Sequence, residues 1–259
     1  MSLQPLRHVT VMRYVLPLRE GGSLPALADG DDGFKYVVKF RGAGHGVKML
    51  ISELLGGLIA KELGLRVPEL VFIHLDEDFG RTEADEEIQD LLKFSKGLNL
   101  GLHYLSSALT YEPKMVVEAG EASLIVWLDC YITNIDRTFK NTNMLWWKQQ
   151  LWLIDHGASF YFHHSWQNIP KAARSVFPYV KDHVLLPYAK ELHKADAFAH
   201  SVLSREVLAA IVEQIPSDWL LWEDVESSPE QLRAIYLEFL VERLENSHLF
   251  LKQASDARV

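Results

Sequence analysis

Cysteine is almost absent from this sequence. Of 259 residues only Cys130 carries a thiol, which excludes an internal disulfide and a zinc site built from several cysteines. Cys130 lies in an apolar run with helical character, so we expect it in the core and not as a nucleophile. The low cysteine content also fits a reducing compartment.

Long apolar runs are lacking as well. None approaches the roughly 20 residues that a membrane span needs, and neither end shows a charged and then apolar targeting pattern. Basic residues are outnumbered, with 26 Lys and Arg against 35 Asp and Glu and a formal net charge of −9. This excess argues against a nucleic-acid partner that binds a broad basic face. We therefore expect a cytoplasmic protein that binds neither membranes nor nucleic acid.

Much of the acidity is concentrated in residues 75–90, where eight carboxylates accompany one arginine. We interpret this run as a solvated loop or insertion without a catalytic role. The hydrophobic content of 48% leaves ample material for a core in the rest of the chain.

The first part of the chain predicts β-strands. Residues 7–15 alternate between apolar and polar side chains. Residues 34–41 alternate more clearly, with Phe34, Tyr36 and Val38 on one face and Lys39 on the other.

A glycine-rich stretch, Gly21-Gly22-Ser23, lies between these two strands. Such a loop can bring backbone N–H groups close to phosphates, because glycine lacks the side chain that would block their approach. The same residues also form ordinary turns, so both interpretations stay open from this stretch alone.

A helix is predicted over residues 48–63, ended by Gly64, and another strand over residues 69–75. Glu53 has apolar neighbours on this helix, which is unusual for a carboxylate. It is either solvated at the margin of the helix or faces the sheet and pairs with Lys39.

Helical patterns dominate the second part of the chain. Residues 94–108 are ambiguous between strand and loop, and helices are predicted at residues 114–131, 204–215 and 228–251. Ser228 and Gln231 form a capping box at the start of the last one. The order of elements predicts an α+β fold of two lobes, with a small β-rich lobe over residues 1–112, a larger helical lobe over residues 113–259 and a site in the cleft between them.

Three polar residues interrupt apolar runs in the middle of the chain. Asp136 is followed five residues later by Asn141, and an apolar strand then ends at Asp155. This spacing can present one carboxylate to a hydroxyl group and two oxygen ligands to a divalent metal, which is the chemistry of phosphoryl transfer. Asp136 and Asn141 also suit a structural turn, whereas Asp155 beside a core strand requires a partner.

The segment Asn134-Ile135-Asp136-Arg137-Thr138-Phe139-Lys140-Asn141 resembles the catalytic loop of the HipA-like kinases, Asn-x-Asp-x-His-x-Lys-Asn. It is also similar to the Asp-Arg-His-x-x-Asn loop of phosphoinositide kinases. Thr138 stands where both families have histidine, and we consider His156 or another histidine as a substitute for that imidazole.

The segment Trp152-Leu153-Ile154-Asp155-His156-Gly157 resembles the Ile-Asp-Phe-Gly metal-binding strand end of the same superfamily. With the glycine-rich stretch, the Lys39 strand and the Glu53 helix, the resemblance covers most of residues 15–165. It implies a protein-kinase-like fold, and we expect a compact HipA-like kinase without an extra N-terminal subdomain.

The resemblance also implies roles for single residues. Asp136 would orient or deprotonate the acceptor hydroxyl, and Lys140 would neutralise charge on the transferred group. Asn141 and Asp155 would hold Mg²⁺. The remaining implied residues bind ATP: Lys39 contacts its phosphates, Glu53 orients Lys39, and the glycine-rich loop is Gly21, Gly22 and Ser23.

The expected partners are ATP, Mg²⁺ and a hydroxyl acceptor, for which a Ser or Thr of a protein is the family-level expectation. Two alternatives stay open. One is a pseudokinase, a nucleotide-binding or interaction module whose Thr138 and His156 no longer support turnover. The other is a metal-dependent hydrolase that uses Asp155 with His156, His163 and His164. Against the hydrolase, adjacent histidines on a strand point to opposite faces, and we expect His163 and His164 at a lobe surface or cleft wall. The oligomeric state stays open.

Overall fold

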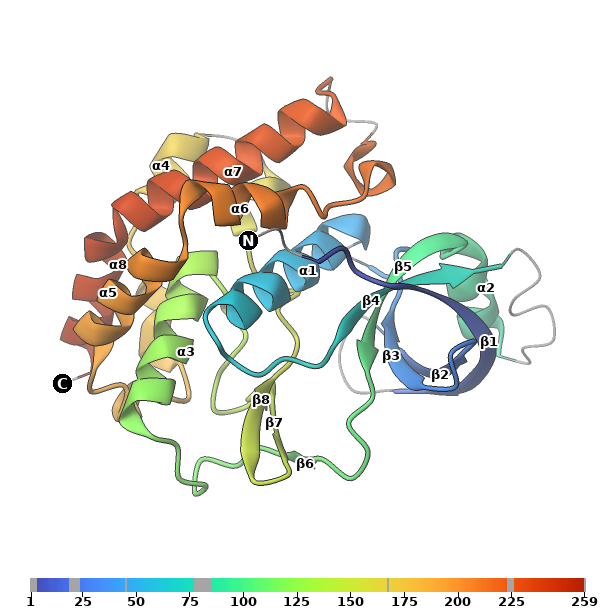
Figure 1. Ribbon diagram of the computed structural model, residues 1–259, viewed down its shortest axis with the longest axis horizontal. Coiled ribbons are helices and arrows are strands. Elements are labelled where there is room, and N and C mark those ends of the chain that lie inside the picture. The colour runs from blue at the N-terminus through green and yellow to red at the C-terminus, as the bar shows by residue number, and fades with distance from the viewer. Residues whose placement is uncertain are drawn as a thin grey trace.

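The computed structural model describes residues 4–18, 24–44, 46–76, 85–166, 168–222 and 226–258. Strands gather in the first part of the chain and helices in the second, with the long helix α1 running between them (Figure 1). The fold is therefore α+β, as the sequence predicts. Within the described ranges, none of the helices combines the length and hydrophobicity that a bilayer span requires.

Five strands form a closed barrel in the order β1-β2-β3-β5-β4. Their bounds are β1 His8–Pro17, β2 Ala26–Gly30, β3 Lys35–Lys39, β4 Leu70–Leu75 and β5 Gly97–His103. The pairing of β1 with β4 is parallel and closes the ring, while the other four pairings are antiparallel. Each strand of the ring therefore pairs with two neighbours.

The barrel has a core of its own, to which Tyr36 and Val38 contribute from β3. Lys39 ends this strand and is also buried, although it lies outside that apolar cluster. The assignment of Phe34 to the apolar face is wrong, because Phe34 lies in the tight turn before β3 and is exposed. Gly33 supplies a positive φ of 82° at this turn.

Helix α1, Gly46–Glu62, is buried on nearly every side from Met49 to Ala60. It packs against the barrel strand β5 and against helices of the second part, which explains why it is apolar all round instead of amphipathic. The predicted end is confirmed at Gly64, whose φ of 74° turns the chain while the N–H of Leu65 donates to the carbonyl of Ala60.

The acidic run over residues 75–90, expected to be a solvated loop or insertion, is helical in its last part, and residues 77–84 lie outside the described residues. Helix α2, Glu86–Phe94, begins in this last part, and the side chain of Asp85 accepts hydrogen bonds from its first backbone N–H groups. Two acidic residues in the first turn suit the positive end of the helix dipole. Ile88 and Leu92 pack onto the barrel core, so the acidic residues Glu86, Glu87 and Asp90 lie on the exposed face of an amphipathic helix.

The second part contains a small sheet and most of the helices. The sheet has the order β6-β7-β8, with β6 Leu109–Thr110, β7 Met144–Trp147 and β8 Gln150–Leu153. The α-helices are α3 Ala119–Ile132, α4 Ile169–Ala173, α5 Leu192–Val202, α6 Arg205–Val212, α7 Pro229–Glu245 and α8 Ser247–Ala257.

The helices predicted at residues 114–131 and 228–251 differ most from the structure in their bounds. Helix α3 begins at Ala119, later than residue 114, after a turn in which the N–H of Met115 donates to Glu112. The helix predicted at residues 228–251 is interrupted at Asn246, which separates α7 from α8. The capping box at its start is confirmed, because Ser228 and Gln231 each accept a hydrogen bond from the other's backbone N–H.

Arg243 of α7 lies in the core and ties the end of α3 to the end of α4. Its guanidinium donates to the carbonyl groups of Cys130, Tyr131, Ala172, Ala173 and Ser175. Helix ends carry carbonyl groups without intrahelical partners and a partial negative charge. Burial lowers the pKa of Arg243 to about 10, which leaves it charged at neutral pH. Cys130 is buried beside it, as predicted.

We expect Arg243→Met to lower the free energy of unfolding by about 3 kcal/mol or more, because several buried carbonyl groups lose a charged donor at once. Urea unfolding followed by circular dichroism measures this. Arg205→Met is the matched control, since Arg205 pairs with Glu238 at the surface and its loss should leave the midpoint nearly unchanged. Equal midpoints for both variants would contradict this role of Arg243.

His163 lies in the short 3₁₀-helix Tyr161–His164 and is fully buried. The expectation that it lies on a strand at a lobe surface or cleft wall is therefore wrong; its Nδ1 lies 2.9 Å from the hydroxyl of Tyr236 on α7. Burial, with smaller effects from His164 and Lys48, holds the pKa of His163 well below its ordinary value. His163 is neutral in the folded protein.

This burial predicts a loss of stability in mild acid. An unfolded histidine takes up a proton as the pH falls below about 6.5, whereas folded His163 does not. Its stabilising effect is complete above that pH and is lost as the pH falls, by up to about 1.4 kcal/mol per pH unit. Unfolding free energies at pH 7, 6 and 5 should fall less steeply for His163→Leu than for the wild type. Replacing the exposed His248 by Leu is the control, and an unchanged slope in His163→Leu would contradict the assignment.

Candidate active site

A cleft of about 870 Å³ lies between the barrel and the small sheet. Its walls come from the barrel, from the segment that connects β5 to α3, and from the loops around β7 and β8. The lining side chains include Val37, Lys39, Leu102, Tyr104, Leu105, Tyr111, Phe139, Lys140, Asn141, Asn143, Met144, Ile154 and Asp155. Four residues that the sequence singles out, Lys39, Lys140, Asn141 and Asp155, therefore line one cleft although they are far apart in the chain.

Lys39 lies between two carboxylates at the inner end of the cleft. Its Nζ is 3.0 Å from Oε1 of Glu53 and 3.1 Å from Oδ1 of Asp155. The ion pair expected between Lys39 and Glu53 is present, and the side chains of these two residues are 6% and 0% exposed. Asp155 is 39% exposed, so it is the member of the trio that faces the open cleft.

The trio has opposed effects on pKa. Burial raises the pKa of Glu53, and the charge of Lys39 offsets this rise only in part. Two carboxylates share one ammonium, and Glu53 is the more deeply buried of the two and therefore the harder to ionise. Burial also acts to raise the pKa of Asp155, but Lys39 outweighs it and the pKa of Asp155 falls below its ordinary value. Burial disfavours the charged form of Lys39, yet Glu53 and Asp155 together raise its pKa. Asp155 and Lys39 are thus charged at neutral pH.

The backbone after β8 turns sharply to direct Asp155 into the cleft. Asp155 has a φ of 56°, in the left-handed region that Asp tolerates better than most residues. The N–H of the preceding Ile154 donates to the carbonyl of Asn143. The N–H of the following His156 donates to Oε2 of Glu53 at 2.9 Å. Glu53 therefore orients Lys39 with one oxygen and fixes the Asp155 segment with the other.

Glycine at position 56 lets this segment lie directly on α1. A Cβ added at Gly56 would be 2.6 Å from Cβ of His156, closer than such atoms approach in folded proteins. The imidazole of His156 is buried against the helix, and burial lowers its pKa to about 3. His156 is therefore a neutral packing residue next to Asp155 and does not face the cleft.

The loop from Asn134 to Asn143 shapes the surroundings of Asp136. Oδ2 of Asp136 accepts hydrogen bonds from the side-chain amides of Asn141, at 2.8 Å, and Asn143, at 3.1 Å. The N–H of Asp136 donates to Oδ1 of Asn134. Asp136 is thus brought to Asn141, as the sequence predicts. The role of Asn143 was not predicted, because a second asparagine two residues after Asn141 has no distinct pattern.

A buried ion pair connects this loop to the Asp155 strand. Asp129 of α3 accepts from Nε of Arg137 at 2.6 Å, and both side chains are fully buried. Arg137 also donates to the carbonyl of Asn143 and, at 3.3 Å, to that of Ile154. Burial disfavours the charged form of Asp129, but Arg137 and His183 hold its pKa well below the usual range.

Sequence reasoning missed the structural role of this pair. The available signal was a carboxylate within the apolar run from Leu124 to Ile132 of helix α3, followed eight residues later by an arginine in the loop. A buried charge requires a partner, and the nearest cation in the chain is the partner that Asp129 has.

His183 supplies an imidazole near Thr138, where the resembling families have histidine in the loop. The backbones of Thr138 and His183 form an isolated antiparallel bridge. Nδ1 of His183 accepts from the N–H of Leu185, which places its proton on Nε2, 2.9 Å from Oδ2 of Asp129. The imidazole therefore joins the Asp129 and Arg137 cluster from another segment. Thr138 instead accepts the N–H of Asn141 and closes the turn.

Gly21, Gly22 and Ser23 lie outside the described residues.

Among the residues that the structure does describe, no group of three His, Cys, Asp or Glu side chains is arranged to hold a metal ion. The hydrolase alternative therefore lacks a ligand set in the described chain, and the buried His163 and His156 explain why.

Comparison with known proteins agrees with this geometry. The model of the HipA-like kinase family matches residues 11–252. The chain therefore belongs to the HipA-like kinase family, and it is a phosphotransferase. No curated protein sequence matches it significantly.

The fold is similar to that of solved kinases. The crystal structure of the Helicobacter pylori proinflammatory kinase CtkA has a TM-score of 0.56 at 13% identity, over 98% of this chain and 99% of that one. The crystal structure of the Golgi casein kinase has a TM-score of 0.50 at 11% identity, over 100% of this chain and 76% of that one. The protein-kinase-like fold expected from the sequence is confirmed.

We expect Gly56→Ala to weaken ATP binding in the presence of Mg²⁺ by tenfold or more, about 1.4 kcal/mol, because the added methyl group displaces His156 and with it Asp155. Isothermal titration calorimetry measures the affinity. The matched control is Gly120→Ala in α3, where the nearest atom to an added Cβ is 3.5 Å away. Alanine favours helix over glycine at both positions by up to about 1 kcal/mol, so helix propensity does not distinguish the two variants. An unchanged affinity in Gly56→Ala would contradict the prediction, because it would show that the Asp155 segment tolerates displacement.

Proposed function

We propose that this protein transfers the γ-phosphate of ATP to the hydroxyl of a Ser or Thr in a protein, with Mg²⁺ as the metal. The observation that carries the proposal is the convergence of Lys39, Asn141 and Asp155 on one cleft, with Asp136 held against Asn141. Family membership supports the kinase reaction. The acceptor class, the metal and the residue roles are proposals.

We assign residues 1–112 to a small lobe and residues 113–259 to a large lobe, with ATP in the cleft between them. The segment from β5 to α3 lines one wall of the cleft with Tyr104, Leu105 and Tyr111. This wall supplies apolar and aromatic surface for the adenine ring. Lys39 lies at the inner end, where its ammonium can contact the phosphates.

Asp155 and Asn141 have the donor chemistry that Mg²⁺ requires. Mg²⁺ prefers oxygen ligands and is usually held by one or two protein groups together with phosphates and water. Asp155 is ionised, and its carboxylate faces the cleft. Asn141 gives its amide nitrogen to Asp136, which leaves its carbonyl oxygen for a ligand. When bound, the metal would neutralise phosphate charge.

Asp136 suits the role of the residue that orients the acceptor hydroxyl. A carboxylate in this role needs an oxygen within hydrogen-bond reach of the hydroxyl and a fixed orientation. The two asparagine amides hold Oδ2 of Asp136. Lys140 lines the same cleft and is exposed, so its ammonium can approach the transferred phosphoryl group.

The departures at Thr138 and His156 do not remove any of these groups. Thr138 closes the loop turn and His156 packs on α1, so both have structural contacts away from the reacting atoms. This supports turnover over a module that only binds nucleotide. Phosphoryl transfer, measured separately from Mg-ATP binding, distinguishes a kinase from a module that only binds nucleotide.

We expect Asp155→Asn to abolish the part of ATP-dependent thermal stabilisation that requires Mg²⁺, because the metal loses its ionised ligand. Asp136→Asn should retain that stabilisation but lose at least about a hundredfold in phosphoryl transfer, the lower range for a positioned acid or base. Differential scanning fluorimetry with and without EDTA measures the first effect, and transfer of labelled γ-phosphate measures the second.

The results separate the possible outcomes. Stabilisation of the wild type by Mg-ATP without any transfer, and without a change in Asp136→Asn, would favour the non-catalytic module. Unchanged Mg²⁺-dependent stabilisation in Asp155→Asn would show that the metal assignment is wrong.

A further inference from the structure

His183 is a buried histidine that reaches the candidate active site from a distant segment. It is 3% exposed and directly follows the 3₁₀-helix Pro178–Asp182. Its Nδ1 accepts the N–H of Leu185 at 3.0 Å, so the ring proton lies on Nε2, 2.9 Å from Oδ2 of Asp129. The imidazole therefore donates a hydrogen bond to the carboxylate that anchors the Asp136 loop.

The backbone holds this segment in place without help from the imidazole. His183 pairs with Thr138 in an isolated antiparallel bridge. The N–H of the next residue, Val184, donates to the carbonyl of Arg137 at 3.1 Å, and Val184 itself is buried in the main core. The bond from the imidazole to Asp129 is thus an additional contact, made by a segment that is already fixed.

A continuous chain of hydrogen bonds leads from His183 to Asp136. Oδ2 of Asp129 accepts from His183 and also, at 2.6 Å, from Nε of Arg137. Another nitrogen of Arg137 donates to the carbonyl of Asn143. The side-chain amide of Asn143 in turn donates to the carbonyl and to Oδ2 of Asp136, each at 3.1 Å. The first four residues of the chain are buried, which strengthens each hydrogen bond.

The partners of Asp129 differ in where they come from. Arg137 donates to both of its oxygens, and the side-chain amide of Asn134 donates to Oδ1 at 2.9 Å. Asn134 and Arg137 both belong to the loop, whereas His183 belongs to a separately packed segment. The Asp129 side chain can rotate together with the loop unless a group outside the loop also holds it. His183 is such a group.

We propose that His183 is a positioning residue for phosphoryl transfer, because its imidazole holds Asp129 and thereby keeps the Asp136 carboxylate aimed at the acceptor hydroxyl. The link runs through Arg137 and Asn143. This inference rests on the proposed function of Asp136 and adds a residue that is remote in the sequence.

The groups proposed for metal and nucleotide have separate support. Glu53 accepts from the N–H that follows Asp155, and Lys39 contacts both carboxylates. Asn141 also donates directly to Asp136 at 2.8 Å, so Asp136 keeps one amide when the chain from His183 is broken. Loss of the imidazole should therefore lower kcat in part and leave KM for ATP near its wild-type value.

The first test compares His183→Leu with His183→Gln in the transfer of labelled γ-phosphate to dephosphorylated casein. Leucine removes the donor, whereas the glutamine amide keeps an N–H near the position of Nε2. His183→Leu should lower kcat about tenfold, less than the loss expected for Asp136→Asn. His183→Gln should restore most of this loss. Equal kcat values in the two variants would overturn the inference.

The second test asks whether the effect passes through Asp136. In Asp136→Asn the carboxylate is absent, so adding His183→Leu should lower kcat by no more than about twofold. A general loss of structure would act equally in both backgrounds. A full further loss of about tenfold in the double variant would contradict the assignment.

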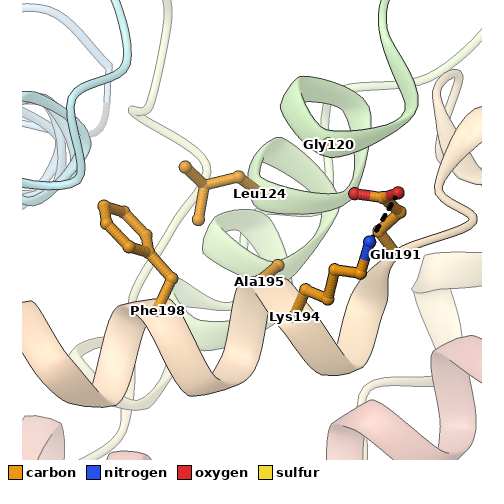
Figure 2. A pocket seen from close by; sticks show the side chains of 6 residues that line it. All are labelled: Gly120, Leu124, Glu191, Lys194, Ala195 and Phe198. Carbon is orange, nitrogen blue, oxygen red and sulfur yellow. Dashed lines mark hydrogen bonds and ion pairs between the residues drawn. The ribbon is translucent and has the colours of Figure 1, made fainter.

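Leu124→Ala is the control for looser packing of α3, the helix that carries Asp129. Leu124 lines a small hollow between α3 and α5 together with Ala195 and Phe198 (Figure 2). Its truncation should lower the midpoint of unfolding and leave kcat unchanged, because the hydrogen bonds of Asp129 do not involve Leu124. A fall in kcat as large as in His183→Leu would mean that helix packing alone explains the effect.

The side-chain amide of Asn143 reports the same link without turnover. Its NMR signals, assigned through their loss in Asn143→Ser, should shift further from the wild type in His183→Leu than in His183→Gln. Both variants lack the ring and differ mainly in the donor.

These signals distinguish the inference from the proposed function. If the wild type transfers no phosphate, the proposed function fails, and the amide signals decide the positioning link on their own. If phosphate is transferred while kcat and the amide signals of His183→Leu equal those of the wild type, the positioning inference fails and the proposed function stands.

Discussion

The ion pair between Asp129 and Arg137 is the contact on which the site depends most. Charged groups are costly to bury, and here the cost is offset because almost every donor and acceptor of the pair has a partner. Through Arg137 the pair fixes the carbonyl groups before β7 and after β8. The loop with Asp136 and the strand end with Asp155 therefore keep a common position relative to α3.

Helix α1 carries the other half of the arrangement. Glu53 contacts both the barrel residue Lys39 and the backbone of His156, so one side chain links the barrel, the helix and the Asp155 segment. The close approach at Gly56 makes this link short. Arg243 secures the opposite end of the framework, because it satisfies the carbonyl groups at the end of α3 directly before the loop begins. The polar groups in the cleft are thus supported by buried polar contacts behind them.

Local patterns in the sequence predicted much of this fold. The alternation around Lys39, the apolar helix with Glu53 and the capping box at Ser228 each depend on residues close in the chain. The acidic run hid α2, because its two apolar anchors, Ile88 and Leu92, are few among many carboxylates. The break at Asn246 was missed because apolar residues continue at helical spacing on both sides of it.

The candidate site was predicted where a known motif fixes the spacing and missed where distant segments meet. Lys39, Asn141 and Asp155 follow from motif order. The pairing of His183 with Asp129 joins residues 54 positions apart, and no local pattern marks it. His163 was misplaced because a 3₁₀-helix buries one of two adjacent histidines, whereas the sequence around it suggested a strand.

The closed barrel limits how this protein can meet other chains. An open sheet can bind an extended partner by accepting it as one more strand. In this ring β1 and β4 already pair with each other over His8–Thr10 and Phe72–His74, so these residues offer no free backbone edge. The three-stranded sheet is open, yet part of the β8 edge is occupied where the N–H of Leu153 donates to the carbonyl of Arg66. Where the described strands are paired on both sides, the barrel can recognise a polypeptide only through side chains, which makes recognition sensitive to the partner's sequence and not merely to its extended shape.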